Sequence, residues 1–200
     1  RAAPGAIERV LIVDGRPEFK TIDDEPPVGI CGSGLLDAVA QLRLANLVDK
    51  RGRLAGPQVH EVDGDVGFVL ATAAEAGGQP IAVTQHDIRE LQLAKGAIRC
   101  GIETLLQDAG ITAGDLDKVI ISGAFGTYID VESAIIIGLL PQVPPERVAQ
   151  VGNAAGTGAR LALISRAYRQ QGRELAQRVR YLELARTPRF MRNFAEAMGL

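Results

Sequence analysis

Short apolar runs of β-rich composition alternate along the chain with segments in which apolar residues recur at helical spacing. The turn Asp14-Gly15 separates the first two runs, which favours a hairpin there. The predicted strands are residues 6–13, 18–22, 68–70, 81–83, 119–121 and 148–151. The predicted helices are residues 35–42, 85–108 and 131–137, one that ends near Ser165, and one or two amphipathic helices within 166–198, broken near Thr187-Pro188. Strands that alternate with helices predict an α/β fold.

Residues 85–108 form the strongest predicted helix. Thr84 or Asp87 is suited to open it and Gly110 to end it. The apolar spacing predicts that one stripe faces the core, formed by Ile88, Leu91, Ala94, Ile98, Ile102 and Leu105.

Three further expectations concern local structure. Ser33 is a plausible cap for the helix over 35–42. Residues 49–65 are polar and glycine-rich and are expected to form a loop. The apolar run 119–121 is compact enough for a strand buried on both faces.

The 200 residues suffice for one domain with its own core, and 46% of them are hydrophobic, which excludes wholesale disorder. No apolar stretch approaches the roughly 20 residues of a membrane span, and no secretory signal is visible. We therefore expect no membrane association. The first residue is Arg1 rather than Met, so we expect the chain to be part of a longer polypeptide.

Charge is distributed unevenly. Residues 1–159 carry 13 basic and 21 acidic side chains, whereas 160–200 carry nine arginines, no lysine and three acidic side chains. A basic end can attract an acidic partner or simply form a solvated helix face. Only eight residues are aromatic, and binders of single-stranded nucleic acid usually present aromatic platforms. We therefore expect no nucleic-acid partner.

The two cysteines, Cys31 and Cys100, are not in a CxxC pair, and His60 and His86 are far apart. A metal site within this chain is not expected. So few cysteines suit a reducing cytoplasm. No histidine lies near Cys31 in sequence, so a buried packing role is favoured over a thiol nucleophile.

Three segments place a strand, a glycine-rich turn and a helix in succession, an arrangement suited to phosphate or nucleotide binding. They are residues 29–34, 121–126 and 152–159. None matches a Walker A loop or GxGxxG. Taken singly, a glycine-rich turn more often serves only a tight turn or close packing. Phe125 could stack on a base or cover the core, and Asn153 could cap a helix or touch a ligand.

Six segments nevertheless occur in an order that resembles one family. They are Pro4-Gly5-Ala6-Ile7-Glu8, Gly29-Ile30-Cys31-Gly32-Ser33-Gly34-Leu35-Leu36-Asp37, residues 87–98, Ser122-Gly123-Ala124-Phe125-Gly126-Thr127-Tyr128-Ile129-Asp130, Gly138-Leu139-Leu140-Pro141 and residues 151–159. Together they resemble the C-terminal part of the reductive activators of corrinoid proteins. This family belongs to the superfamily of sugar kinases, heat-shock chaperones and actin (ASKHA).

The resemblance implies a ribonuclease H-like, actin-like ATPase lobe with a mixed sheet and packing helices, over 1–165. Residues 166–200 would form a basic helical C-terminal extension. By the same resemblance, Gly123, Ala124, Phe125 and Gly126 are the adenosine motif. Gln92 and Lys95 would face the nucleoside, and Gly32, Ser33 and Gly34 would lie at the floor of the site. Residues 152–159, with Asn153, would match the helix that connects two lobes.

For function, the resemblance implies that ATP with Mg²⁺ supports reduction of Co(II) to Co(I) in a corrinoid protein or cobalamin-dependent methyltransferase. The electrons would come from a [2Fe-2S] cluster on a domain outside this chain. The phosphate loops of the superfamily are not found in 1–200, so the 200 residues alone would be inactive. Other lobes of the same protein would be partners, with a homodimer left open. The alternatives are a small-molecule kinase of the same superfamily and a non-catalytic nucleotide-binding module.

Overall fold

A computed structural model describes residues 2–188 and 190–200, and the side chains of all of these except Ala124 and Phe125. Its first sheet has the order β2-β1-β3. Strand β1 (Ala6–Val13) pairs antiparallel with β2 (Arg16–Thr21) and parallel with β3 (Gly29–Ile30). The predicted hairpin is confirmed, and the sheet is mixed.

Helix α1 (Gly32–Leu44) packs against β1 and supplies much of the core. Its buried residues include Leu36, Val39 and Leu42, as the apolar spacing predicted. Gly34 allows the close approach of helix and strand, because a Cβ there would lie 2.0 Å from the carbonyl oxygen of Ile7. The prediction that Ser33 caps α1 is wrong. Cys31 is the N-cap residue, without a side-chain capping bond, and Ser33 lies in the first turn.

The second sheet has the order β4-β5-β6 and is antiparallel. Its strands are β4 (Val59–Val62), β5 (Asp65–Ala71) and β6 (Ile81–Thr84). β4 lies inside the segment predicted as a loop, which is a correction. Its sequence, Val-His-Glu-Val, is too short for the alternation to stand out, and pairing with β5 supplies its hydrogen bonds.

Helix α2 (Gln85–Ala109) begins with a capping box. Thr84 accepts a hydrogen bond from the Asp87 N–H, and the Asp87 carboxylate accepts one from the Thr84 N–H. Gly110 ends the helix in a left-handed conformation. Both ends of α2 thus follow the prediction.

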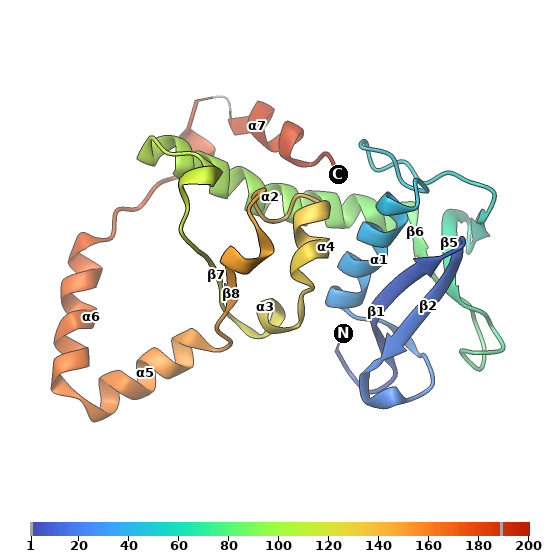
Figure 1. Cartoon of the computed structure of the whole chain (residues 1–200), viewed down its shortest axis with the longest axis horizontal. Coiled ribbons are helices and arrows are strands. Elements are labelled where there is room, and N and C mark those ends of the chain that lie inside the picture. The colour runs from blue at the N-terminus through green and yellow to red at the C-terminus, as the bar shows by residue number, and fades with distance from the viewer. Residues whose placement is uncertain (1, 189) are drawn as a thin grey trace.

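The buried stripe predicted for α2 is confirmed at Ile88, which lies in the core, and is wrong for half of its members. Ala94, Ile98 and Leu105 are exposed. The residues that are buried on α2 are Ile88, Gln92, Lys95, Gly96, Cys100 and Thr104. The reason is tertiary: helix α7 (Phe190–Ala197) and residues 198–200 lie along α2 and cover this more polar face (Figure 1).

Strands β7 (Val119–Ile121) and β8 (Val148–Gln150) form a separate parallel pair. The expectation that β7 is buried on both faces is wrong, because Ile120 is 65% exposed. In the sequence, α3 (Ala124–Tyr128) and α4 (Val131–Ile136) lie between β7 and β8. Ile137, the residue after α4, packs into the core. Short 3-10 turns occur at Ile22–Asp24, Ala113–Asp115, Pro145–Arg147 and Leu184–Arg186.

Helices α5 (Ala154–Ile164) and α6 (Arg166–Arg178) meet at a corner at Ser165 and extend away from the rest of the molecule (Figure 1). The predicted break near Thr187-Pro188 precedes α7. The division of the chain at residue 165 stays a prediction. In the structure that position lies between α5 and α6, and α7 returns to pack on α2.

None of the described helices has the length and apolarity needed to cross a bilayer.

Candidate functional site

The first glycine-rich segment, residues 29–34, runs from β3 into the start of α1. The Cys31 N–H donates to the carbonyl of Ile7 at 3.1 Å, and its thiol donates to the same oxygen at 3.3 Å. The Cys31 sulfur lies 3.1 Å from the Ser33 hydroxyl. Cys31 is 3% exposed. These contacts hold the start of α1 on β1 and support the packing role predicted for this cysteine.

The second segment, residues 122–126, turns from β7 directly into α3. Gly123 has φ +99°, a conformation that L side chains rarely adopt. A Cβ on Gly126 would lie 2.3 Å from Cγ2 of Ile121. One glycine therefore makes the turn and the other lets α3 pack against β7. The alternatives for the Phe125 side chain, and the position of the Ala124 side chain, lie outside what the structure describes.

The third segment lies beside the second. The Gly123 N–H donates to the carbonyl of Gly152 at 2.7 Å. Asn153 caps α5, because its Oδ1 accepts a hydrogen bond from the Gly156 N–H at 2.8 Å. Both segments follow the carboxyl ends of the parallel strands β7 and β8, where ligands bind in open α/β sheets. Of the two roles open to Asn153, the structure shows the cap.

A cavity of about 560 Å³ connects the first segment with the end of α3. This volume is in the range of small-molecule sites. Its walls combine small apolar residues with a few polar groups, among them the Ser33 hydroxyl. The lining residues are Ala2, Ala3, Pro4, Glu8, Ile22, Cys31, Gly32, Ser33 and Tyr128. The start of α1 and the helix that follows Gly123 therefore face one space.

Gln92 and Lys95 do not line this cavity. The Gln92 amide donates to the carbonyls of Met198 at 3.0 Å and Arg51 at 3.2 Å, and the Lys95 ammonium donates to the carbonyl of Gly199. Burial and, to a smaller extent, the nearby Arg99 charge lower the pKa of Lys95 to about 8, against the opposing effect of the Glu103 carboxylate. The structure thus places both side chains under residues 198–200, apart from the glycine-rich segments.

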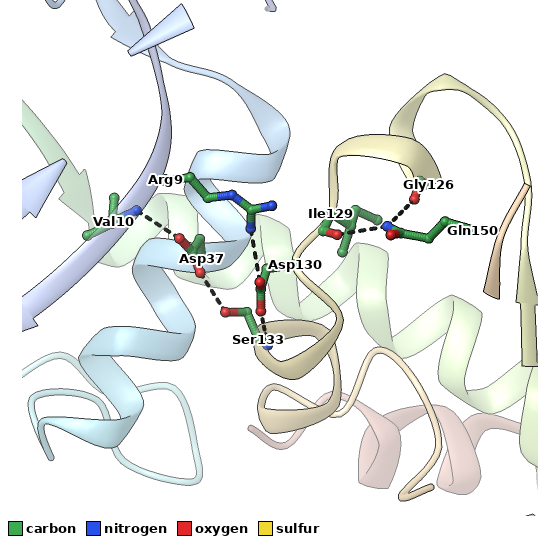
Figure 2. A network of polar contacts seen from close by, with 8 residues as sticks. All are labelled: Arg9, Val10, Asp37, Gly126, Ile129, Asp130, Ser133 and Gln150. Atoms are coloured by element: carbon green, nitrogen blue, oxygen red, sulfur yellow. Dashed lines mark hydrogen bonds and ion pairs between the residues drawn. The ribbon is translucent and has the colours of Figure 1, made fainter. Parts of the chain in front are cut away.

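Two polar clusters at the elements that line the cavity were not predicted (Figure 2). In one, the Asp37 carboxylate accepts hydrogen bonds from the Val10 N–H at 2.8 Å and the Ser133 hydroxyl at 2.5 Å. In the other, the Gln150 amide donates to the carbonyls of Gly126 at 2.5 Å and Ile129 at 2.9 Å. The only sequence signal for Asp37 is a carboxylate at an otherwise apolar stretch of a predicted helix, and Gln150 has none.

The residues present do not suit an iron–sulfur cluster. Such a cluster is held by four cysteine thiolates, whereas Cys31 and Cys100 are the two cysteines of the sequence, and both are free and buried. Among the described residues, no group of three or more His, Cys, Asp or Glu side chains could hold a metal ion. Any cluster chemistry must involve residues outside this chain.

Comparison with known proteins gives consistent results. A family model described as the C-terminal domain of RACo, the ASKHA domain, matches residues 1–200. The chain is 38% identical over 206 residues to the corrinoid activation enzyme RamQ of Eubacterium limosum, covering 97% of this chain and 35% of that protein. It is 29% identical over 169 residues to a Methanosarcina barkeri protein named [Co(II) methylated amine-specific corrinoid protein] reductase. That match covers 84% of this chain and 28% of that protein.

A solved structure, the reductive activator for corrinoid, iron-sulfur protein, superimposes with a TM-score of 0.89. The two chains share 39% sequence identity, and the match covers 100% of this chain and 33% of that one. This chain therefore spans about a third of the length of its relatives.

Proposed function

This chain belongs to the family of RACo C-terminal ASKHA domains, and we propose that it is the nucleotide-binding lobe of a reductive activator of corrinoid proteins. The match over residues 1–200 confirms the family and the mixed α/β fold that the ordered motifs predicted. The observation that carries the proposal is the cavity at which the start of α1 and the end of α3 meet. The family model matches the chain that forms this cavity along its whole length.

The adenosine end of ATP would contact the turn at 123–126. Gly123 makes this turn without a side chain, and nothing lies within 4 Å of the position a Cβ would take there. The backbone can therefore approach a base or sugar closely. The contact of Gln92 and Lys95 with the nucleoside remains a prediction. It requires residues 198–200 to move off α2, because their carbonyls accept the hydrogen bonds of both side chains.

The phosphate end would extend toward the start of α1. The first N–H groups of a helix have no partners within it and favour an anion, and Ser33 adds a hydroxyl at the cavity wall. Glu8 is the carboxylate that lines the same cavity. Mg²⁺ usually takes one or two carboxylates together with substrate phosphates, and Glu8 would be one of these. The phosphate loops of the superfamily would come from other lobes of the whole protein, so this lobe alone would not hydrolyse ATP.

In the whole protein, a [2Fe-2S] cluster on another domain would supply the electron that reduces Co(II) to Co(I). The partner would be a corrinoid protein or a cobalamin-dependent methyltransferase, in the cytoplasm. ATP can promote this transfer only if the nucleotide states of the protein bind the oxidised and reduced partner differently. The contribution of this chain is to bind the nucleotide and to change its contacts with the other lobes.

The test of the function uses the full-length protein, a corrinoid partner, a chemical reductant and Mg-ATP. The absorption spectrum of the cobalt centre is followed with and without ATP. We expect the Co(I) spectrum to accumulate only when ATP is present. A partner that stays in the Co(II) state with ATP would contradict the proposal, and ATP consumption that depends on a sugar or acyl acceptor would favour a kinase instead.

The test of the site uses two exposed tyrosines. Tyr128 lines the cavity and is 61% exposed, whereas Tyr168, on α6, is 50% exposed and is not among the cavity residues. Neither ring supports the core, so both variants should fold. Tyr128→Ala should weaken ATP binding, measured by titration calorimetry on the full-length protein, and Tyr168→Ala should not. Equal affinity of the two variants would place the nucleotide elsewhere.

A further inference from the structure

The side chain of Asp37 is a carboxylate inside the core, 5% exposed. Its two oxygens accept hydrogen bonds from partners far away in the sequence. Oδ2 accepts from the Val10 N–H on β1, and Oδ1 accepts from the Ser133 hydroxyl on α4 at 2.5 Å. A buried carboxylate is costly unless its oxygens are satisfied, and hydrogen bonds to an ionised group are about twice as strong as neutral ones. Asp37 therefore joins three elements strongly.

The contacts around Asp37 close into a ring (Figure 2). The Ser133 N–H donates to Asp130 Oδ1 at 2.8 Å, and Asp130 Oδ2 lies 3.2 Å from Nη1 of Arg9. Arg9 precedes Val10, whose N–H returns to Asp37. Asp37, Ser133 and Asp130 each make two of these contacts, so the loss of one contact leaves each of the two residues that made it with a single contact. Such a closed polar network fixes relative positions more firmly than a single contact does.

The ring connects the two elements that line the cavity from opposite sides. Asp37 is one helical turn beyond Ser33, on the helix whose first residues line the cavity. Asp130 follows Tyr128, the cavity residue of α3, by two positions and is the N-cap of α4. The Asp37–Ser133 bond is thus a direct side-chain connection between the helix that opens with residues 32–34 and the corner that continues from residues 123–126.

We propose that Asp37 and Ser133 are positioning residues of the nucleotide site, which hold its two sides, the start of α1 and the corner that contains Tyr128, at the separation that one ligand spans. This inference rests on the proposed function. ATP would contact the turn at 123–126 with its nucleoside and the start of α1 with its phosphates. A change in the separation of these two sides would weaken the binding of ATP even in a molecule that stays folded.

The test compares Ser133→Val with Ser133→Thr in the full-length protein. The two side chains have nearly the same shape, but only Thr keeps the hydroxyl that donates to Asp37. ATP affinity is measured by titration calorimetry at a temperature at which circular dichroism shows each variant to be folded. We expect Ser133→Val to lose about tenfold in affinity, which is the worth of one hydrogen bond to a charged group. Ser133→Thr should stay within about twofold of the unmodified protein.

The outcomes separate this inference from the proposed function. If the unmodified protein does not bind ATP, the proposed function fails. If it binds ATP and both variants bind equally well, or both lose affinity equally, the hydroxyl does not position the site and the inference fails. A purely structural role would lower the melting temperature of Ser133→Val and leave the affinity of folded molecules unchanged, which also overturns it. Should Ser133→Val not fold, Ser133→Ala takes its place in the comparison.

Discussion

The buried ammonium of Lys95 donates a hydrogen bond to the main-chain carbonyl of Gly199, 104 residues further along the chain. Lys95 is 2% exposed. Beside it, the Gln92 amide donates to the carbonyl of Met198, and the Leu200 N–H donates to the carbonyl of Lys50 at 3.0 Å. Two hydrogen bonds from α2 and one to Lys50 therefore fix the segment after α7.

This burial predicts a pH dependence of stability. The pKa of Lys95 is about 8 in the folded chain and 10.5 in the unfolded one. Between these values the unfolded chain binds more protons, so the contribution of Lys95 to the free energy of unfolding rises with pH. Below pH 8 the cost of burying the charge is fully present. Between pH 8 and pH 10.5 the free energy of unfolding should rise by about 3 kcal/mol, at about 1.4 kcal/mol per pH unit.

The measurement is urea unfolding at pH 7.5 and pH 9.5. Lys95→Met keeps the length of the side chain but cannot titrate. The increase in the free energy of unfolding between pH 7.5 and pH 9.5 should therefore be smaller in this variant than in the unmodified chain. Lys118→Met removes an exposed lysine and serves as the control, with the rise unchanged. If Lys95→Met and the unmodified chain show the same rise, the ammonium is not buried as described.

The Lys95 contact also shows where prediction from sequence stops. The capping box at Thr84 and Asp87, the first hairpin and the Asn153 cap could be predicted because each depends on residues a few positions apart. The buried face of α2 could not, because residues 190–200 select it from a distance. The apolar spacing placed Ile98 and Leu105 in the core, but both are exposed, because α7 and the residues after it cover a different face of α2.

The same reasoning applies to the site. The glycine-rich segments could be found from sequence because each combines a turn with a helix start. The cavity instead brings the start of α1 together with Tyr128 at the end of α3, and the Asp37–Ser133 bond joins residues 96 positions apart. No local signal marks a pair of this kind.

The close contact between α1 and β1 makes Gly34 sensitive to substitution. A Cβ at Gly34 would lie 2.0 Å from the Ile7 carbonyl oxygen and 2.8 Å from its carbon, and backbone atoms cannot yield as a side chain can. Gly34→Ala should therefore lower the free energy of unfolding by about 3 kcal/mol or more. Gly158→Ala on α5 is the matched control. Its Cβ meets nothing within 4 Å, so the gain in helix propensity should stabilise the chain by up to about 1 kcal/mol.

Urea unfolding of the two alanine variants and the unmodified chain provides the measurement. The two substitutions add the same methyl group within a helix, so they differ chiefly in what the methyl group meets. A Gly34→Ala variant as stable as the unmodified chain would show that α1 does not approach β1 this closely.

Gln150 holds the corner that continues from the second glycine-rich segment. Its amide nitrogen donates to the carbonyls of Gly126 and Ile129. Gln150→Met has a similar shape and no donor, so both carbonyls lose a partner. We expect a loss of stability of about 1–3 kcal/mol and weaker ATP binding by the full-length protein. Gln142→Met is the control: its amide makes one exposed hydrogen bond, to the Ile135 carbonyl, so its effect should stay within about 0.5 kcal/mol.

Thermal unfolding and titration calorimetry check this prediction together. If Gln150→Met binds ATP as tightly as Gln142→Met, the two carbonyl contacts do not shape the site. The same result would leave the Asp37–Ser133 inference unaffected, because Gln150 lies outside that ring of contacts (Figure 2).

The two cysteines offer an internal comparison for the location of the nucleotide. Cys31 lines the cavity, whereas Cys100 is fully buried on α2 and is not among the cavity residues. Both thiols should react slowly with a disulfide reagent in the folded chain and rapidly in urea, because only local or global opening exposes them. A ligand in the cavity stabilises the closed form around Cys31 in particular.

We therefore expect ATP to slow the labelling of Cys31 in the full-length protein while the labelling of Cys100 changes less, as measured by peptide mass spectrometry over time. Equal slowing of both thiols would mean that ATP stabilises the whole fold from another position. No change at either would mean that ATP does not bind this lobe. Only selective protection of Cys31 supports a nucleotide bound against the start of α1, because Cys31 is the cysteine that forms the cavity wall next to Gly32 and Ser33.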